Sequence, residues 1–489
     1  MLLLLAQLAL ARTPQAPPVA AHAEPPPGAA PLILPPSPDR MRPFPGPDFV
    51  PPPVLVRTPS DPTLARLLSS ARTSGHAYSA LGALCEQYSH RFAGTQTLID
   101  AAVWAKGVFE RDGVSVHLEP VDVRHWVRGA ESLKMTAPYA RDLAVIGLGG
   151  TVSGNVTASV VVVDSFDELG PGVKGKIVLY NVAMPQGVPS IQYYGATVPY
   201  RSQGAANAAK FGAVATLTRS VTQHSLYTLH TGGMHYDEGG VKIPSVAVTG
   251  EDADWIAKLV ASGTEVKLTL NVQSQDLPPV PSWNVVAEIP GRTPDVVLIG
   301  AHLDSWDVGQ GANDDGAGVA HVVEAMRVIA EEVKTSGVKP LRTIRGVLYA
   351  NEEFGLEGGK AYDAAHATDH HVAAMESDLG AGIPLSWESG GTPEQRAWLT
   401  QTLAPLGMPV EEGGGGADIS PLQPRGVLMS GLHPDDSHYF DYHHTNADTF
   451  DKISPVALAE GAAAVVGWAW LTANASGAPP AGPVTEPRP

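Results

Sequence analysis

Three short runs of apolar residues follow one another in the second half of the chain: Val296–Ile299 (VVLI), Ile344–Ala350 (IRGVLYA) and Val372–Met375 (VAAM). Their length and aliphatic content predict short, buried β-strands. Strands of this kind are typical of α/β proteins, in which helices cover both faces of the sheet. We therefore expect a mixed, largely parallel central sheet flanked by helices.

The patterns before these runs predict further parts of the fold. Asp61 to Gly113 carries helical signals, and Val114 to Arg128 is predicted to form a pair of strands. Residues 132–272 contain strands and a helix of their own, in segments such as VVVVD, KGKIVLY, AANAAKFG and IPSVAVT. We expect an insert over 132–272 within a discontinuous main domain formed by 61–131 and 273–474.

The two ends of the chain differ in composition from the rest. The opening MLLLLAQLALA is apolar, too short to span a bilayer and followed by small-residue sites, which predicts a signal peptide over 1–23. Residues 24–60 are rich in Pro and Ala and are predicted to be a linker or pro-segment, and 475–489 a disordered tail. No other segment is expected to cross a membrane. The protein is therefore predicted to be secreted or periplasmic, without membrane association once the signal is removed.

Side chains of metal-ligand type follow the three predicted strands. His302 comes just after the first strand, and Asp314 follows it across a glycine-rich loop. Glu352 and Glu353 follow the second strand, and Asp378 follows the third. Ligands in open α/β sheets gather outside the carboxyl ends of the strands, so these loops should converge. An imidazole beside a carboxylate that can bridge two cations is a donor set suited to a zinc pair.

Charge and cysteine content narrow the range of functions. The formal net charge is -18, so the chain lacks the basic surface on which nucleic-acid binding depends. Cys85 is the single cysteine, which excludes an internal disulfide and a cysteine-rich metal site. Metal ligands must therefore come from His, Asp and Glu.

The motifs together resemble a known family. HLDSWDVGQGANDDG, the EE pair before a glycine-rich turn, MESD and HHTNADT are similar to the co-catalytic di-zinc exopeptidases and aminopeptidases, within them the plasma glutamate carboxypeptidase (carboxypeptidase Q) branch. The likeness extends through YRSQGAANAAKFGA, SLYTLHTG and VKIPSVAVTGEDAD in the middle of the chain. It implies the zinc-exopeptidase fold, with the insert as a β-rich α+β protease-associated domain that roofs the active site.

The resemblance also implies two zinc ions per chain, held by five residues: His302, Asp314, Glu353, Asp378 and His444. Asp314 would bridge the ions, with His302 and Asp378 completing one site, and Glu353 and His444 the other. Three protein ligands for each ion leave an open position, as in catalytic zinc sites. Glu352 would be the general base that takes a proton from a metal-bridging water or hydroxide and passes it to the leaving amine.

Several neighbours are candidates for supporting roles. Asp304, two residues after the first ligand, is expected to hydrogen-bond that imidazole and fix its tautomer, and a turn-capping aspartate is the alternative. His443 and His444 are adjacent, and the family pattern favours His444 as the ligand. His443 would then line the pocket, with Tyr439 and Tyr442 as candidate substrate contacts.

The implied activity is that of a metallo-exopeptidase, a hydrolase that acts on dipeptides or short peptides and forms a homodimer. Aminopeptidase and carboxypeptidase directions both stay open. A glutaminyl cyclase-like enzyme is one alternative, disfavoured by the bridging Asp314. A non-catalytic receptor or binding module is another, disfavoured because every ligand position is filled. The run Gly413–Gly416 lacks the spacing of a nucleotide-binding loop and is expected at the pocket edge.

Overall fold

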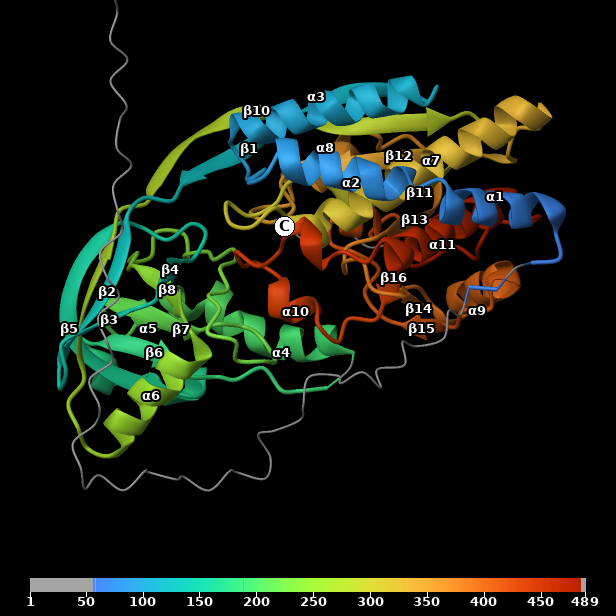
Figure 1. The fold of residues 1–489 in the computed structure, drawn as a ribbon. Helices are drawn as coiled ribbons and strands as arrows, with labels where there is room; N and C mark the ends of the chain where they lie inside the picture. The colour runs from blue at the N-terminus through green and yellow to red at the C-terminus, as the bar shows by residue number, and fades with distance from the viewer. Residues whose placement is uncertain (1–55, 58, 188, 485–489) are drawn as a thin grey trace, which may run out of the picture. The chain divides into compact units, whose positions relative to one another are not determined.

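The structure is a computed structural model that describes residues 56–57, 59–187 and 189–484. The expected signal peptide and nearly all of the expected linker lie outside the described residues. The described residues belong to one compact unit, in which two eight-stranded sheets are the main architectural elements (Figure 1). We call them the main sheet and the insert sheet.

The main sheet confirms the mixed, largely parallel arrangement. Its strands, in spatial order, are β1 (Ser115–Val127), β10 (Gln275–Ile289), β12 (Arg342–Tyr349), β11 (Thr293–His302), β13 (His371–Glu376), β16 (Leu428–Pro434), β14 (Pro384–Ser389) and β15 (Val410–Glu412). The central strands β11, β12, β13 and β16 are parallel, whereas β10 and β14 run antiparallel to them. β11, β12 and β13 are the three strands predicted from the apolar runs.

Helices cover both faces of this sheet. Val297 and Ile299 of β11 belong to one apolar cluster, and Leu298 belongs to another together with Tyr362. Because alternate side chains are buried on both faces, the strand is apolar throughout. The flanking helices are α1 (Pro62–Thr73), α2 (His76–Gln87), α3 (Gln96–Arg111), α7 (Ala317–Ser336), α8 (Glu357–Ala365), α9 (Pro393–Leu403) and α11 (Pro455–Asn474) (Figure 1). The short helix α10 (Tyr439–Tyr442) lies apart from them, toward the insert.

Helix α11 is unusually apolar. It is the one helix among the described residues that is long and apolar enough, by length and composition, to cross a membrane. The expectation that no segment beyond the N-terminus is apolar enough to cross a membrane is therefore wrong. In the fold 78% of its apolar window is buried, and α11 packs against α1 and α7. A helix that is apolar on all sides is what such burial requires.

The insert sheet is built entirely from strands between residues 131 and 272. In spatial order they are β3 (Arg141–Leu143), β2 (Glu131–Ala137), β9 (Lys267–Val272), β5 (Gly154–Val163), β6 (Ile177–Tyr180), β7 (Ala215–Arg219), β8 (Ser245–Val248) and β4 (Ile146–Gly147). Ile177, Leu217, Val246 and Leu268 are fully buried in a separate apolar cluster of this sheet. Its helices are α4 (Ser190–Ser202), α5 (Gly204–Ala209) and α6 (Gly250–Ala261).

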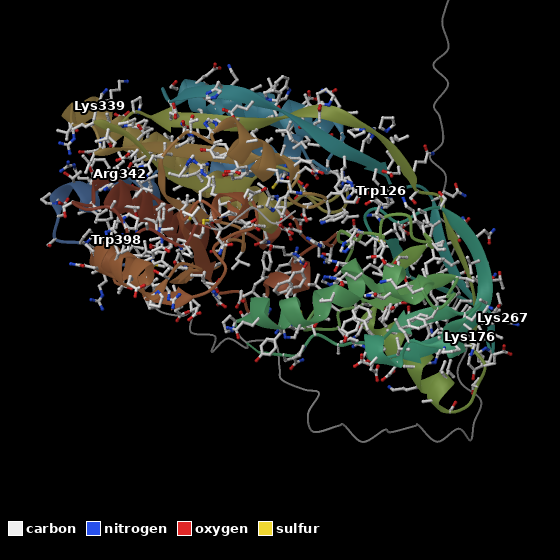
Figure 2. All side chains as sticks on the ribbon, turned by 180° about the vertical axis from the view of Figure 1, so that it is seen from behind. Trp126, Lys176, Lys267, Lys339, Arg342 and Trp398 are labelled. Carbon is white, nitrogen blue, oxygen red and sulfur yellow. The ribbon has the colours of Figure 1, made fainter. Side chains whose placement is uncertain are left out.

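Strands β1 and β10 connect the two sheets as an antiparallel ribbon. Their pairing runs from Ser115 opposite Glu288 to Val127 opposite Gln275, with one register shift. The segment expected to be a pair of strands is thus one long strand whose partner is far away in sequence. Trp126 lies where the ribbon passes from one sheet toward the other (Figure 2), and its indole N–H donates to the carbonyl of Thr151 at 3.0 Å.

The described part of the expected tail, residues 475–484, follows the surface of the unit. The Gly482 N–H donates to the Gly426 carbonyl at 3.2 Å, and Val484 forms a β-bridge with Arg425. Gly482 and Val484 are thus held by main-chain contacts.

Candidate metal centre

The ends of three neighbouring strands bring the predicted ligand-type residues together. His302 is the last residue of β11, Glu352 and Glu353 follow β12, and Asp378 follows β13. β11 pairs in parallel with both β12 and β13, so the three loops leave the sheet at one edge. Asp314 lies in a single turn at Ala312–Gly316 that precedes α7.

Asp314 lies between two histidines. Its Oδ1 is 3.2 Å from Nε2 of His302, which is also 3.2 Å from Oδ1 of Asp378. Its Oδ2 is 3.3 Å from Nε2 of His444, which is also 2.9 Å from Oε2 of Glu353. The side chains therefore form two adjacent groups that share one carboxylate.

The remaining nitrogens of the two imidazoles face main-chain carbonyls. Nδ1 of His302 is 3.1 Å from the carbonyl of Asp304, and Nδ1 of His444 is 3.3 Å from that of Thr231. A proton on Nδ1 leaves the Nε2 lone pair free toward the cluster, as metal ligation requires. Oδ2 of Asp314 and Oε1 of Glu353 are buried without a hydrogen-bond partner in the described structure. These residues thus fit a pair of bound cations.

The raised pKa values of two buried glutamates also indicate that the site suits bound cations. Burial, reinforced by Asp314 and opposed by His444, raises the pKa of Glu353 to about 7. Burial, opposed by His302 and reinforced by Asp378, raises the pKa of Glu352 well above its ordinary value. Buried carboxylates this close repel one another, and cations between them would remove that cost.

His443 is close to the same carboxylate but makes fewer contacts than His444. Its Nε2 is 3.6 Å from Oδ2 of Asp314, and its ring stacks on His444 at 3.5 Å between centroids. Only His444 of the two also contacts Glu353. The geometry therefore favours His444 for the second group and leaves His443 on the cavity wall.

Asp304 makes contacts through both its main-chain carbonyl and its carboxylate. Its main-chain carbonyl meets His302, whereas its carboxylate is 3.7 Å from that imidazole. The carboxylate oxygens instead accept the N–H groups of Glu352 at 3.0 Å and Glu353 at 3.3 Å. Asp304 thus fixes the loops that carry three of the site's side chains.

Two supporting residues were not predicted from the sequence. The Trp306 indole N–H donates to Oε2 of Glu353 at 2.6 Å. The Asp448 carboxylate accepts the N–H groups of Asn313 at 2.7 Å and Asp314 at 3.1 Å. Trp306 lies in the motif HLDSWD and Asp448 in HHTNAD, both of which carry the resemblance. Their place in these motifs was the one sequence feature that could have indicated a role at the site.

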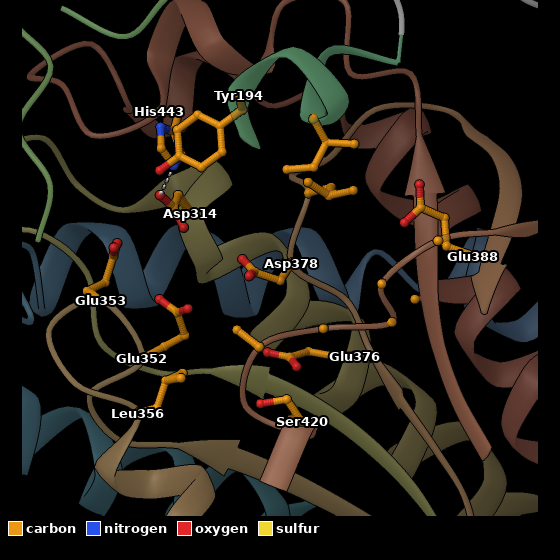
Figure 3. A pocket seen from close by; sticks show the side chains of 18 of the residues that line it. Tyr194, Asp314, Glu352, Glu353, Leu356, Glu376, Asp378, Glu388, Ser420 and His443 are labelled. Carbon is orange, nitrogen blue, oxygen red and sulfur yellow. Dashed lines mark ion pairs between the residues drawn. The ribbon is translucent and has the colours of Figure 1, made fainter. Parts of the chain in front are cut away.

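A cavity of about 840 Å³ opens beside this cluster, and Figure 3 shows Glu352, Glu353 and Asp378 among its lining residues. The loop Gly413–Gly416 lines it, as expected for a pocket edge. Of the candidate substrate contacts, His443 and Tyr439 line the cavity, and Tyr442 is not among the lining residues. The insert contributes Ile191, Tyr194, Arg201 and Gly233.

A second group of ligand-type side chains lies nearby, made of His224, His438 and Asp441. Nδ1 of His224 is 2.7 Å from one oxygen of Asp441, and Nδ1 of His438 is 2.9 Å from the other. Both histidines are therefore already paired with the carboxylate. This group ties the insert to the residues around α10.

Comparison with known proteins identifies the family. Residues 284–469 match the model of Peptidase family M28. The chain is 38% identical to carboxypeptidase Q of Xenopus laevis, over 79% of this chain and 83% of the relative, and 38% identical to that of Homo sapiens, over 80% and 84%. The crystal structure of a peptidase M28 precursor from Shewanella amazonensis is similar with a TM-score of 0.81 at 36% identity, over 86% of this chain and 98% of that one. BSAP, a zinc aminopeptidase from Bacillus subtilis, shares the fold with a TM-score of 0.59 at 20% identity, over 81% and 94%.

The chain therefore belongs to Peptidase family M28 and is a metallo-exopeptidase. Within that family its relatives at 37–38% identity are carboxypeptidase Q proteins from vertebrates. The predicted family, fold class and enzyme class are confirmed.

Proposed function

We propose that this protein is a secreted or periplasmic di-zinc exopeptidase that hydrolyses dipeptides or other short peptides. The division of Asp314 between two histidines is the observation that carries the proposal. His302 and Asp378 would hold one ion, and Glu353 and His444 the other, with Asp314 shared. Imidazole and carboxylate donors in groups of three are typical of catalytic zinc sites.

Glu352 is proposed as the general base. Zinc at this centre would acidify a water molecule and polarise the scissile carbonyl. Glu352 lines the cavity, and its main-chain N–H is held by Asp304. Its carboxylate would take the proton from the attacking water and deliver it to the nitrogen of the leaving amine. Glu353, its neighbour, points to His444 instead.

The cavity suits a short peptide. Its volume of about 840 Å³ lies within the usual range for small-ligand sites. Side chains from the insert close one side, which fits the proposal that the insert is a protease-associated domain that limits substrate length. We therefore propose short peptides, rather than internal bonds of long chains, as the substrates.

Two neighbouring substitutions test this assignment. We expect Glu352→Gln to retain two zinc ions per chain and to lose turnover of a dipeptide by about 10²- to 10⁴-fold, the usual contribution of general acid–base catalysis. Glu353→Ala should lose zinc, because it removes a proposed ligand. Zinc content by mass spectrometry of the metal and initial rates on the same preparations separate the two effects. Equal metal loss in both variants would contradict the division of roles.

A further inference from the structure

The second group of ligand-type side chains, His224, His438 and Asp441, takes no part in the proposed reaction and is not among the residues that line the cavity. We call it the outer triad. His224 follows β7 in the insert, Asp441 lies in α10, and His438 directly precedes that helix (Figure 1). His438 and Asp441 are three residues apart, so their side chains leave the same side of the turn. The outer triad thus joins the insert to α10.

The three side chains of the outer triad converge as the ligands of one ion do. One ligand atom of each lies within 4.8 Å of those of the other two. Oδ1 of Asp441 is 2.7 Å from Nδ1 of His224, and its Oδ2 is 2.9 Å from Nδ1 of His438. In the proposed zinc centre the contact between His444 and Glu353 is also 2.9 Å. The same spacing therefore suits either two hydrogen bonds or one shared cation.

The charge around the outer triad favours a cation. Among the described residues Asp441 has no arginine or lysine partner, and its ion-pair contacts are with the two imidazoles. Another histidine–carboxylate group, His366 with Glu119 and Asp369, differs in this respect, because Arg345 contacts Asp369 at 2.9 Å and supplies a positive charge there. A cation beside Asp441 would therefore be attracted without repulsion from a guanidinium or ammonium group in contact with the same carboxylate.

The outer triad is also accessible to ions from solvent. The side chains of His224 and His438 are 39% and 51% exposed, whereas that of Asp441 is 8% exposed. The carboxylate is thus fixed by its surroundings, and the two imidazoles can close onto an ion beside it. Two imidazoles and one carboxylate with a free fourth position form a donor set that zinc accepts in proteins.

We propose that the outer triad binds a divalent transition-metal ion, with zinc as the representative, at a site separate from the proposed catalytic centre. Nδ1 of each imidazole and one oxygen of Asp441 would be the ligands, with water in the fourth position. Each imidazole would then carry its proton on Nε2. Cobalt and nickel share the preference of zinc for such donors.

The ion would add a connection between two segments that already contact one another. The Thr231 N–H of the insert donates to the carbonyl of His444 at 3.0 Å, and Nδ1 of His230 is 2.9 Å from the carbonyl of His443. The outer triad joins the same two segments a few residues earlier in each. A bound ion would therefore stabilise the insert against the segment that ends at His444.

The test measures zinc content after equilibrium dialysis of the full-length protein against buffered, micromolar free zinc. The parent is compared with His224→Gln and His438→Gln. We expect the parent to hold one zinc ion more per chain than either variant. The affinity of this site should fall by more than about 100-fold, beyond the loss caused by a residue that only orients a ligand. A difference of one ion between parent and variant does not depend on how many ions the catalytic centre holds.

Two further variants separate a metal site from a pair of hydrogen bonds. Asp441→Asn keeps the shape of the side chain and an acceptor oxygen but removes the charge, and it should lose the same ion. His370→Gln is the matched control, because His370 is also exposed and lies 2.9 Å from a carboxylate, that of Asp295, outside any group of three ligands in the described structure. Its zinc content should equal that of the parent. Added zinc should raise the Tm of the parent and of His370→Gln more than that of the triad variants.

Three outcomes would overturn the proposal. Equal zinc content in the parent and the triad variants would show that Asp441 is held by hydrogen bonds alone. Retention of the additional ion in any one of the three triad variants would show that the ion lies elsewhere. Loss of an ion in His370→Gln as well would assign the additional zinc to adventitious binding at surface histidines. Loss of one ion in all three triad variants, with none lost in His370→Gln, would support the site.

Discussion

The main sheet and the insert sheet contribute to the same cavity in different ways. All the proposed zinc ligands and Glu352 come from outside the insert, and four of these residues lie at or just after the ends of adjacent parallel strands: His302, Glu352, Glu353 and Asp378. The insert contributes Tyr194 and Arg201, which depend on where α4 is placed. In the proposed function the chemistry comes from residues outside the insert, and the insert closes one side of the cavity.

Among three further substitutions, the largest effect is expected beside the metal centre, at Asp448. Asp448→Ala removes the acceptor that holds the main-chain N–H groups of Asn313 and Asp314. We expect zinc affinity to fall by about 10- to 100-fold, as for other residues that orient metal ligands, with activity lost in parallel. Titration with a zinc chelator measures the affinity. Asp451→Ala, at an exposed carboxylate nearby, should change nothing, and a similar loss there would contradict this role of Asp448.

An intermediate effect is expected where the insert contacts the main domain. The Asp436 carboxylate accepts the Ser190 N–H at 2.6 Å and the Ser190 hydroxyl at 2.7 Å, at the start of α4. Asp436→Ala should loosen α4 and raise KM for a free dipeptide about tenfold, with zinc content unchanged. Asp435→Ala is the matched control. Zinc loss in Asp436→Ala would show that the two parts are not separable.

The smallest effect is expected at His76, the first residue of α2, and it concerns the stability of the fold. The carboxylates of Asp112, 3.4 Å from Nε2 of His76, and of Glu324, 3.1 Å from its Nδ1, raise the pKa of His76 to about 9, from an ordinary 6.5. Because the folded pKa is the higher one, this stabilisation is complete below pH 6.5 and is lost as the pH rises through 9.

His76→Gln should therefore lower the unfolding free energy at pH 6 by about 1 kcal/mol or less, and the difference from the parent should vanish near pH 10. Urea unfolding at both pH values measures this difference. A gap that persists at pH 10 would assign the effect to packing instead. The rate per zinc-loaded folded molecule should not change.

The site residues that follow strands of the main sheet could be predicted from the sequence, whereas those from the insert could not. His302, Glu352 and Asp378 each follow an apolar run, and the rule that parallel strand ends converge is enough to bring them together. Arg201 lies in the motif YRSQGAANAAKFGA, which carries the resemblance, but it follows no apolar strand pattern that would place it at the site. A basic residue in the last turn of a helix is ordinarily attributed to the helix dipole, and only the fold shows that this one lines the cavity.

Two differences have the same physical cause. Val114 to Arg128 was expected to be a pair of strands, and the segment's actual partner, β10, begins at Gln275. Pro120 is accommodated because β1 is an edge strand, where a missing N–H breaks no ladder on its open side. The apolar composition of α11 can be read from the sequence, whereas the burial that explains it depends on the fold. Long-range pairing and burial are both absent from local patterns.

The β1–β10 ribbon has a consequence for how such a chain can evolve. Because the outgoing and returning strands stay paired, the insert begins and ends about 4.8 Å apart, the spacing of adjacent strands. Another domain whose termini lie close together could therefore replace the insert at this point without disrupting the main sheet. Replacement of the insert alone could in this way change the substrate preference. The residues of the proposed metal centre would stay unchanged.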